Sequence, residues 1–167
     1  LKQELADGQN AYNIGQPVRE TLTNRRQMTP TQTTVSNVKI TPGIKGPVWE
    51  SIKIAMDLDG FEKGTEGDPK GIEVEIRLYN NSKKIEFKYM MHKLILTDPE
   101  ALYVAFPFSL PDSRIVFETI GGILTQGQQL QGSSSDWNAA QNFVSVRGKK
   151  GQIIVVSNEV PLWHFSD

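Results

Sequence analysis

Two histidines, His92 and His164, belong to the side-chain type that most often transfers protons near neutral pH, so they are the first candidates for catalysis in this 167-residue chain. His92 falls on the polar side of an alternating segment, where a solvated strand histidine is the more common role. His164 lies three residues before Asp167, a spacing too frequent to indicate a metal site. The chain has no G-x-S-x-G motif and no cysteine, which excludes thiol nucleophiles, disulfides and cysteine-bound zinc.

The nineteen Asp and Glu residues include enough carboxylates for a glycosidase acid–base pair. That chemistry needs two carboxyl groups roughly 5–10 Å apart in a cleft. Most of the acids occupy polar positions of expected strands or turns, as Glu73 and Asp59 do, which is typical of solubilising charges. Asp136 and Glu100 differ, since each stands beside aromatic or apolar neighbours. A catalytic carboxylate pair within this chain stays open as the least favoured of the functions.

The most informative window is 119–146, because Asp136 is its one charged residue. The rest is Gly, Gln, Ser, Thr, Asn and apolar residues around Trp137. Uncharged amides and hydroxyls beside an aromatic ring suit a polyhydroxylated, uncharged ligand such as a sugar, which stacks a C–H face on the indole. The alternative is a long surface loop that Trp137 anchors to the core, and composition alone favours this alternative.

From Val35 onward the side chains alternate between apolar and polar with a period of two, as in strands with one buried face. Strands are expected at residues 51–58, 72–79, 85–92, 101–106, 114–119, 142–147, 152–157 and 161–165. Turn residues separate them, including the Asn80-Asn81 pair, which suits a tight hairpin. Eight or nine short strands at this spacing predict an all-β, antiparallel β-sandwich. One short helical turn is expected at residues 135–140, with Ser135 as its cap.

Residues 1–42 differ in composition from residues 43–167, and we expect two regions. The first is an extended N-terminal arm or linker that packs on the sheet, with a short strand near residues 11–14; a disordered tail is the alternative. The second is the β-sandwich domain. Because the chain begins at Leu1 without a signal-like segment, we expect a processed chain or a piece of a longer one.

The net charge of −1 argues against a nucleic-acid partner, since such proteins normally carry a basic surplus. No window of eighteen continuous apolar residues occurs, so no membrane-spanning helix is expected. We therefore expect neither nucleic acid nor membrane among the partners.

Several segments in succession resemble one known family. They are residues 46–51, which include the string GPV, residues 76–87 with LYNNSKKIEF, residues 99–108 with EALYVAFPF, residues 132–137, and residues 161–163. This succession resembles the C-terminal β domain of bacterial glycoside hydrolase family 38 proteins, the α-mannosidase type. The resemblance covers residues 43–167 best.

The resemblance implies an antiparallel β super-sandwich related in fold to galactose mutarotase. In that family the zinc ion and the nucleophilic aspartate belong to an N-terminal catalytic barrel, so it implies no cofactor, metal ligand or catalytic residue in this chain. The expected partner is the N-terminal catalytic domain of the same protein. For a bacterial glycan-degrading enzyme, a periplasmic or extracellular location is favoured.

The family's motif also indicates four residues that bind carbohydrate or face the cleft: Gln129, Gly132, Asp136 and Trp137. The chain departs from the family just before Gly132. Where the family commonly has an acidic residue, Gln, an apolar residue and Pro, residues 128–131 read QQLQ. The acid and the proline are both replaced, which puts in doubt any contact that the acid makes.

We therefore expect a non-catalytic β-sandwich that braces the absent barrel and contributes to its carbohydrate-binding cleft. The alternatives are an independent carbohydrate-binding module, which would present Trp137 with Trp49 or Trp163, and a structural interaction domain. A structural interaction domain would be marked by an exposed apolar patch of more than several hundred Å².

Overall fold

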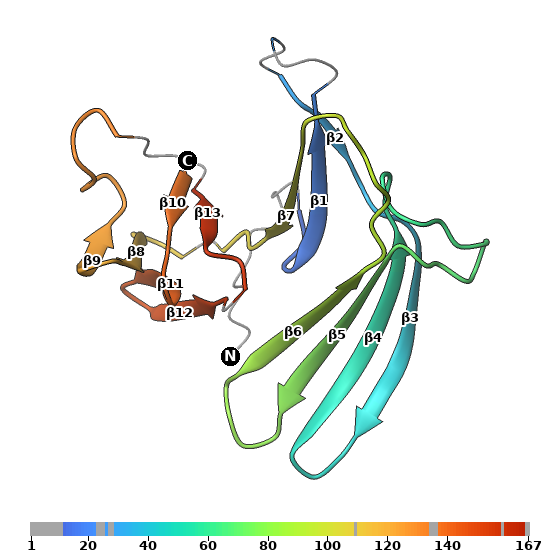
Figure 1. The fold of residues 1–167 in the computed structure, drawn as a ribbon. Coiled ribbons are helices and arrows are strands. Elements are labelled where there is room, and N and C mark those ends of the chain that lie inside the picture. Colours follow the sequence, from blue (N-terminus) through green and yellow to red (C-terminus); the bar gives the residue numbers. More distant parts are fainter. Residues whose placement is uncertain are drawn as a thin grey trace. The chain divides into compact units, whose positions relative to one another are not determined.

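The computed structural model describes residues 12–22, 26, 29–108, 110–133, 137–157 and 159–165. All regular secondary structure in these ranges is β-strand, and every strand ladder is antiparallel (Figure 1). The strands are β1 Gln16–Thr21, β2 Thr31–Thr33, β3 Ser36–Lys45, β4 Trp49–Asp57, β5 Ile72–Tyr79, β6 Ile85–Met91, β7 Glu100–Ala105, β8 Arg114–Thr119, β9 Gly122–Thr125, β10 Trp137–Ala139, β11 Phe143–Gly148, β12 Gly151–Val156 and β13 Leu162–His164.

The predicted fold class is confirmed at the level of an all-β fold with antiparallel sheets, consistent with a β-sandwich. Each of the eight expected strands has a counterpart, and β5, β6 and β8 lie within a residue of the expected bounds. The strict alternation of apolar and polar residues predicted these strands, because one face of each strand packs on apolar neighbours. The finer likeness to galactose mutarotase stays a prediction.

Two local predictions are wrong. The helical turn expected at residues 135–140 is not present at Trp137–Ala139, which form β10 and pair with β13. Cross-strand pairing of Asn138 with Trp163 outweighs the local helical signal there. The strand expected near residues 11–14 is also wrong for the described residues 12–14, since β1 begins at Gln16.

The predicted boundary after residue 42 falls inside β3.

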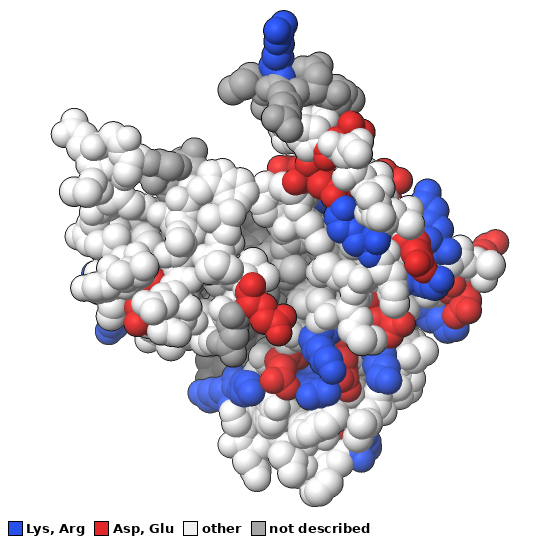
Figure 2. Space-filling model, in the orientation of Figure 1, with Lys and Arg blue, Asp and Glu red and all other residues white. Residues whose placement is uncertain are grey.

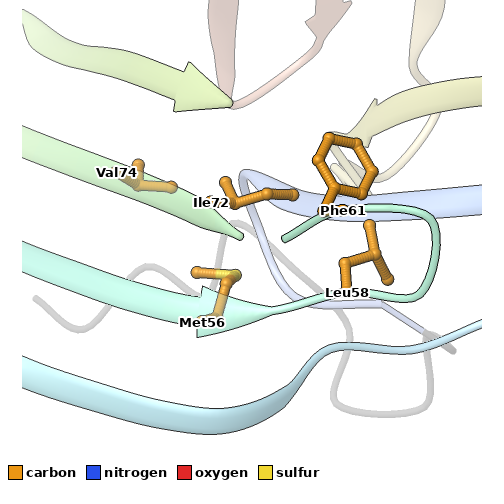
Figure 3. Packing of buried hydrophobic residues seen from close by; sticks show 5 residues of the cluster. All are labelled: Met56, Leu58, Phe61, Ile72 and Val74. Atoms are coloured by element: carbon orange, nitrogen blue, oxygen red, sulfur yellow. The ribbon is translucent and has the colours of Figure 1, made fainter. Parts of the chain in front are cut away.

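The chain forms two compact units, one of residues 15–106 and one that includes residues 107–167. In the first unit, a four-stranded sheet has the order β3-β4-β5-β6 and a three-stranded sheet has the order β2-β1-β7. Met56, Leu58, Phe61, Ile72 and Val74 form its buried core (Figure 3). Leu102 of β7 packs against this cluster, so the two sheets share one core.

In the second unit, a four-stranded sheet has the order β12-β11-β8-β9, and β10 and β13 form a two-stranded ribbon. The core consists of Phe117 and Val144 from the larger sheet with Ala140 and Phe165, which follow the ribbon strands. The rings of Phe117 and Phe165 lie 5.3 Å apart between centroids. This packing orients the ribbon that carries Trp137.

A buried arginine links the two sheets of the first unit. Arg19 of β1 donates from Nε to Glu100 at 2.9 Å and from Nη1 to Asp59 at 3.1 Å. Lys93 makes a second ion pair with Glu100, and hydrogen bonding to Lys93 is the main reason that the pKa of Glu100 lies below its usual range. A Cβ on Gly60 would lie 2.6 Å from Arg19 Nε, so only glycine fits beside the guanidinium.

Asp57, the last residue of β4, anchors the long connection to β5. Its Oδ1 accepts hydrogen bonds from the amides of Gly64 and Lys70, and its Oδ2 accepts one from Asn37. The Lys70 amide contributes most to lowering the pKa of Asp57, which falls from 3.8 to about 2. The folded state therefore stabilises the ionised carboxylate of Asp57 relative to the unfolded chain.

Asp57→Ala should lower the free energy of unfolding by about 2–4 kcal/mol at pH 7, because it removes the acceptor of three half-buried hydrogen bonds. The depressed pKa adds a pH signature. The stabilisation is complete above pH 3.8 and is lost as the pH falls through about 2. Urea unfolding, followed by circular dichroism between pH 2 and pH 7, should show a shallower acid slope for the variant.

Glu73→Ala, at an exposed position of β5, is the matched control and should be nearly neutral. Equal acid slopes for wild type and Asp57→Ala would contradict this role.

Candidate functional site

Trp137 lies on the outward face of the β10–β13 ribbon. In the ladder it is opposite His164, and the two ring centroids are 5.0 Å apart at an interplanar angle of 50°. Trp137 keeps 40% of its surface exposed, and Leu162 on the same face keeps 55%. The ribbon therefore presents an indole, an imidazole and a leucine side by side to solvent.

The inward face of the ribbon explains why Trp137 points outward. Because side chains alternate along a strand, Asn138 and its partner Trp163 lie on the opposite face. Trp163 packs against the core of the unit, and Asn138 is buried. Burial of these two residues directs Trp137 to the surface.

Gln129 connects the polar loop to this ribbon. Its Nε2 donates to Asn138 Oδ1 at 2.8 Å, and its Oε1 accepts a hydrogen bond from the Gly127 amide at 2.8 Å. A buried amide such as that of Asn138 needs its hydrogen bonds satisfied, and Gln129 supplies one of them. Both ends of the Gln129 side chain thus hold the loop in place, and in this conformation they are occupied.

Gly132 lies in a turn in which the amide of Ser133 donates to Leu130 O at 3.0 Å. Its φ of 87° lies in the left-handed region that favours glycine, while an added Cβ would meet no atom within 4 Å. The backbone angle, rather than a close approach, requires glycine here. Asp136, the fourth predicted site residue, lies outside the described residues.

The structure thus brings Gln129 and the Trp137 strand together through Asn138, and leaves Gly132 in the adjoining turn. The same loop carries exposed neutral side chains at Gln128, Gln131 and Ser133. An exposed indole can stack on a sugar ring, and the amides and hydroxyl of the loop are of the kind that bond to sugar hydroxyls. His92, the other histidine, is exposed and follows β6 in the first unit; its backbone bonds to Gly71 and Glu62.

A second cluster of aromatic and charged side chains lies on the polar face of the β3–β6 sheet. The Arg77 guanidinium stacks over the Trp49 ring at 4.5 Å and bonds to Glu75 at 2.6 Å and to Glu86 at 3.4 Å. The Arg77 hydrogen bond is the main cause that lowers the pKa of Glu75, and Tyr79, which donates at 3.0 Å, is the main cause for Glu86. The charges in this cluster are mutually paired, so it stabilises strand pairing.

Sequence reasoning named Trp49 but not this cluster. The period of two already places Trp49, Arg77 and Tyr79 on polar faces of their strands. What the sequence could not provide is the register, in which Trp49 pairs with Tyr79 and Arg77 pairs with Glu86.

The opposite, apolar face of the same sheet extends beyond its covered core. Leu78 and Ile85 lie at the hairpin end of β5 and β6 and are 55% and 52% exposed. Ile52 of β4 and Ile40 of β3 lie further along the sheet and are 43% and 64% exposed. Leu78 pairs with Ile85 on β6 and with Glu50 on β4. Ile52 pairs with Ile76, and Ile40 pairs with Ile54. We call these four residues the open end of the sheet. Figure 2 shows few charged side chains over the hairpin ends of these strands.

Among the described residues, no group of three His, Cys, Asp or Glu side chains could hold a metal ion. No helix in the described part of the chain is long and apolar enough to cross a membrane.

No protein-family model, curated protein or solved structure matches this chain.

Gln129→Ala should destabilise the loop by about 1–2 kcal/mol, because the buried Asn138 oxygen and the Gly127 amide each lose a partner. Thermal unfolding measures the change, and proteolysis of residues 126–133 should become faster. Gln131→Ala, at an exposed position of the same loop, is the matched control and should lie within about 0.5 kcal/mol of wild type. Equal stability of the two variants would show that Gln129 does not hold the loop.

Proposed function

We propose that this chain is the non-catalytic β-structured part of a family 38, α-mannosidase-type glycoside hydrolase and braces the catalytic domain of that protein. The observation that carries the proposal is the open end of the β3–β6 sheet. Leu78 and Ile85 stand exposed as a cross-strand pair, and Ile52 and Ile40 stand exposed further along the same face, beside a core that is otherwise well packed. A contiguous apolar patch on a folded surface is typical of a docking site.

The family resemblance indicates which domain would dock at the open end, namely the catalytic barrel. Segments that include GPV and LYNNSKKIEF belong to the two hairpins that end at the open end. Domain interfaces within one chain commonly bury roughly 600–1,500 Å², and apolar area contributes about 25 cal/mol per Å² removed from water. The zinc ion and the nucleophile of the family would belong to the docked barrel.

Leu78→Asp tests this proposal in the full-length protein expressed from the reading frame that contains these residues. The aspartate would be buried and unpaired at the interface, so the midpoint of thermal inactivation of α-mannosidase activity should fall by several degrees. In the isolated 167-residue chain the same change should lower the unfolding midpoint less, because Leu78 is already exposed there and the new aspartate meets only the cross-strand Glu50.

The matched control is Ile120→Asp, which introduces the same aspartate at an exposed turn of the second unit and should leave thermal inactivation unchanged. Two results would contradict the proposal: a reading frame without a catalytic barrel, or equal inactivation midpoints for Leu78→Asp and wild type. Turnover of an aryl α-mannoside by the isolated chain at an enzyme-like rate would also overturn it.

A second candidate function is carbohydrate binding at Trp137. The observation that favours it is the exposed indole beside the uncharged loop that Gln129 holds to β10. This surface could serve the parent enzyme's cleft or act as an independent module.

Trp137→Ala should abolish the heat of binding that we expect in calorimetric titration with mannose oligosaccharides, because the sugar loses its stacking surface. Trp49→Phe is the control and should leave that heat unchanged. If wild type gives no heat at millimolar ligand, the carbohydrate function is wrong for this chain.

A further inference from the structure

The two edges of the β3–β6 sheet are built differently. Along β3 the pairing with β4 shifts register twice, between Ser36 and Lys39 and between Pro42 and Lys45. Asn37 has a positive φ of 48°, and Pro42 lacks an amide hydrogen. Bulges and prolines of this kind keep an exposed edge from pairing with another strand.

The β6 edge has none of these protections. All seven residues of β6 pair with β5 without a register shift, and the strand contains neither Pro nor Gly. Within the described part of the chain, β6 ends the strand order of its sheet. A regular edge of this length is a template for a further strand.

The direction of the β6 amides follows from the neighbouring hydrogen bonds. The His92 amide donates to Gly71 O, which extends the β5–β6 ladder. The Asn80 amide donates to Val48 O, which extends the β4–β5 ladder just beyond the Trp49–Tyr79 pair. Because bonding alternates along an antiparallel strand, Glu86, Lys88 and Met90 direct their backbone groups to β5. Ile85, Phe87, Tyr89 and Met91 direct theirs away from the sheet.

The sequence of β6 is complementary to itself when a second copy approaches antiparallel with Phe87 at the two-fold axis. Phe87 then faces Phe87 of the partner subunit, and Ile85 faces Tyr89 of the partner subunit, all with outward amides. Glu86 lies opposite Lys88 of the partner subunit, and Lys88 lies opposite Glu86 of the partner subunit. Opposite charges in such cross-strand pairs are favourable.

Other registers are poorer. An axis at Glu86 would set two glutamates opposite each other, and an axis at Lys88 would set two lysines opposite each other, both of which are unfavourable. The Phe87 register also uses the backbone groups that β5 leaves unused. An axis at Ile85 overlaps the two β6 strands at a single residue, and an axis at Tyr89 sets Lys88 opposite Met90 of the partner subunit. The Phe87 register therefore alone combines opposite-charge pairs, outward amides and a long overlap of the two strands.

We propose that β6 is a dimerisation edge, at which a second copy of this chain adds its own β6 antiparallel and continues the sheet. The interface is isologous, as two-fold dimers require, and closes without leaving β6 exposed for further growth. It uses the edge of the sheet, whereas the proposed catalytic-domain contact uses the open end of its apolar face. Ile85 belongs to both surfaces, but Lys88 belongs only to the dimer edge and Leu78 only to the open end, so variants at these two positions test the proposals separately.

Sedimentation velocity of the 167-residue chain, from micromolar to millimolar concentration, tests the dimer. Wild type should show a concentration-dependent dimer, and Lys88→Glu should raise its Kd by roughly tenfold or more by placing glutamates opposite each other. Lys39→Glu makes the same charge change on the β3 edge and should leave the Kd unchanged. Ile85→Pro removes an outward amide without breaking the ladder with β5, and should also weaken the dimer.

The register has its own test, since the chain contains no cysteine. In the proposed pairing Lys84 faces Met90 of the partner subunit across a non-hydrogen-bonded pair, the closer kind of cross-strand pair. Lys84→Cys and Met90→Cys chains should form a disulfide-linked dimer efficiently when they are mixed and oxidised, but not separately. Circular dichroism checks that each variant folds. A monomeric wild type, an unchanged Kd for Lys88→Glu, or equal cross-linking with and without mixing would each overturn the proposal.

Discussion

The structure of the first unit depends on one constraint: the apolar face of β4, β5 and β6 is longer than the sheet that covers it. Leu102 of β7 packs on the buried end of this face, and Tyr89 donates to Gly15 O at 2.7 Å, so cover reaches the middle of β6. Beyond that, the alternation continues to Leu78 and Ile85 without cover. The covered part of this apolar face stabilises the sheet, and the uncovered part can contact another protein surface.

Most of this fold follows from alternation, and the exceptions have physical reasons. Residues 72–79 and 85–91 could be predicted because every second side chain is apolar. β1 was missed because its buried positions include Pro17 and Arg19, and the arginine is buried only through ion pairs with Asp59 and Glu100, forty and eighty-one residues away. β10 was missed because three residues carry too little pattern, and pairing with β13 determines it.

The candidate carbohydrate site was only partly predictable for a similar reason. Composition identified the loop and Trp137, since uncharged side chains are conspicuous over such a long window. Composition could not show that Gln129 bonds to Asn138, or that His164 packs beside Trp137, because these contacts need the register of β10 with β13. Likewise, the Trp49–Arg77 stack needs the register of β4 with β5 and could not be found from either strand alone.

Hydroxyl-radical footprinting tests most directly whether the open end is an interface. The longer protein that we propose and the isolated 167-residue chain would be oxidised side by side, with modification of Ile40, Ile52 and Leu78 compared with that of exposed Ile120. The account predicts strong protection of the three open-end residues in the intact protein and none at Ile120. Equal modification of Ile40, Ile52 and Leu78 in both samples would contradict it.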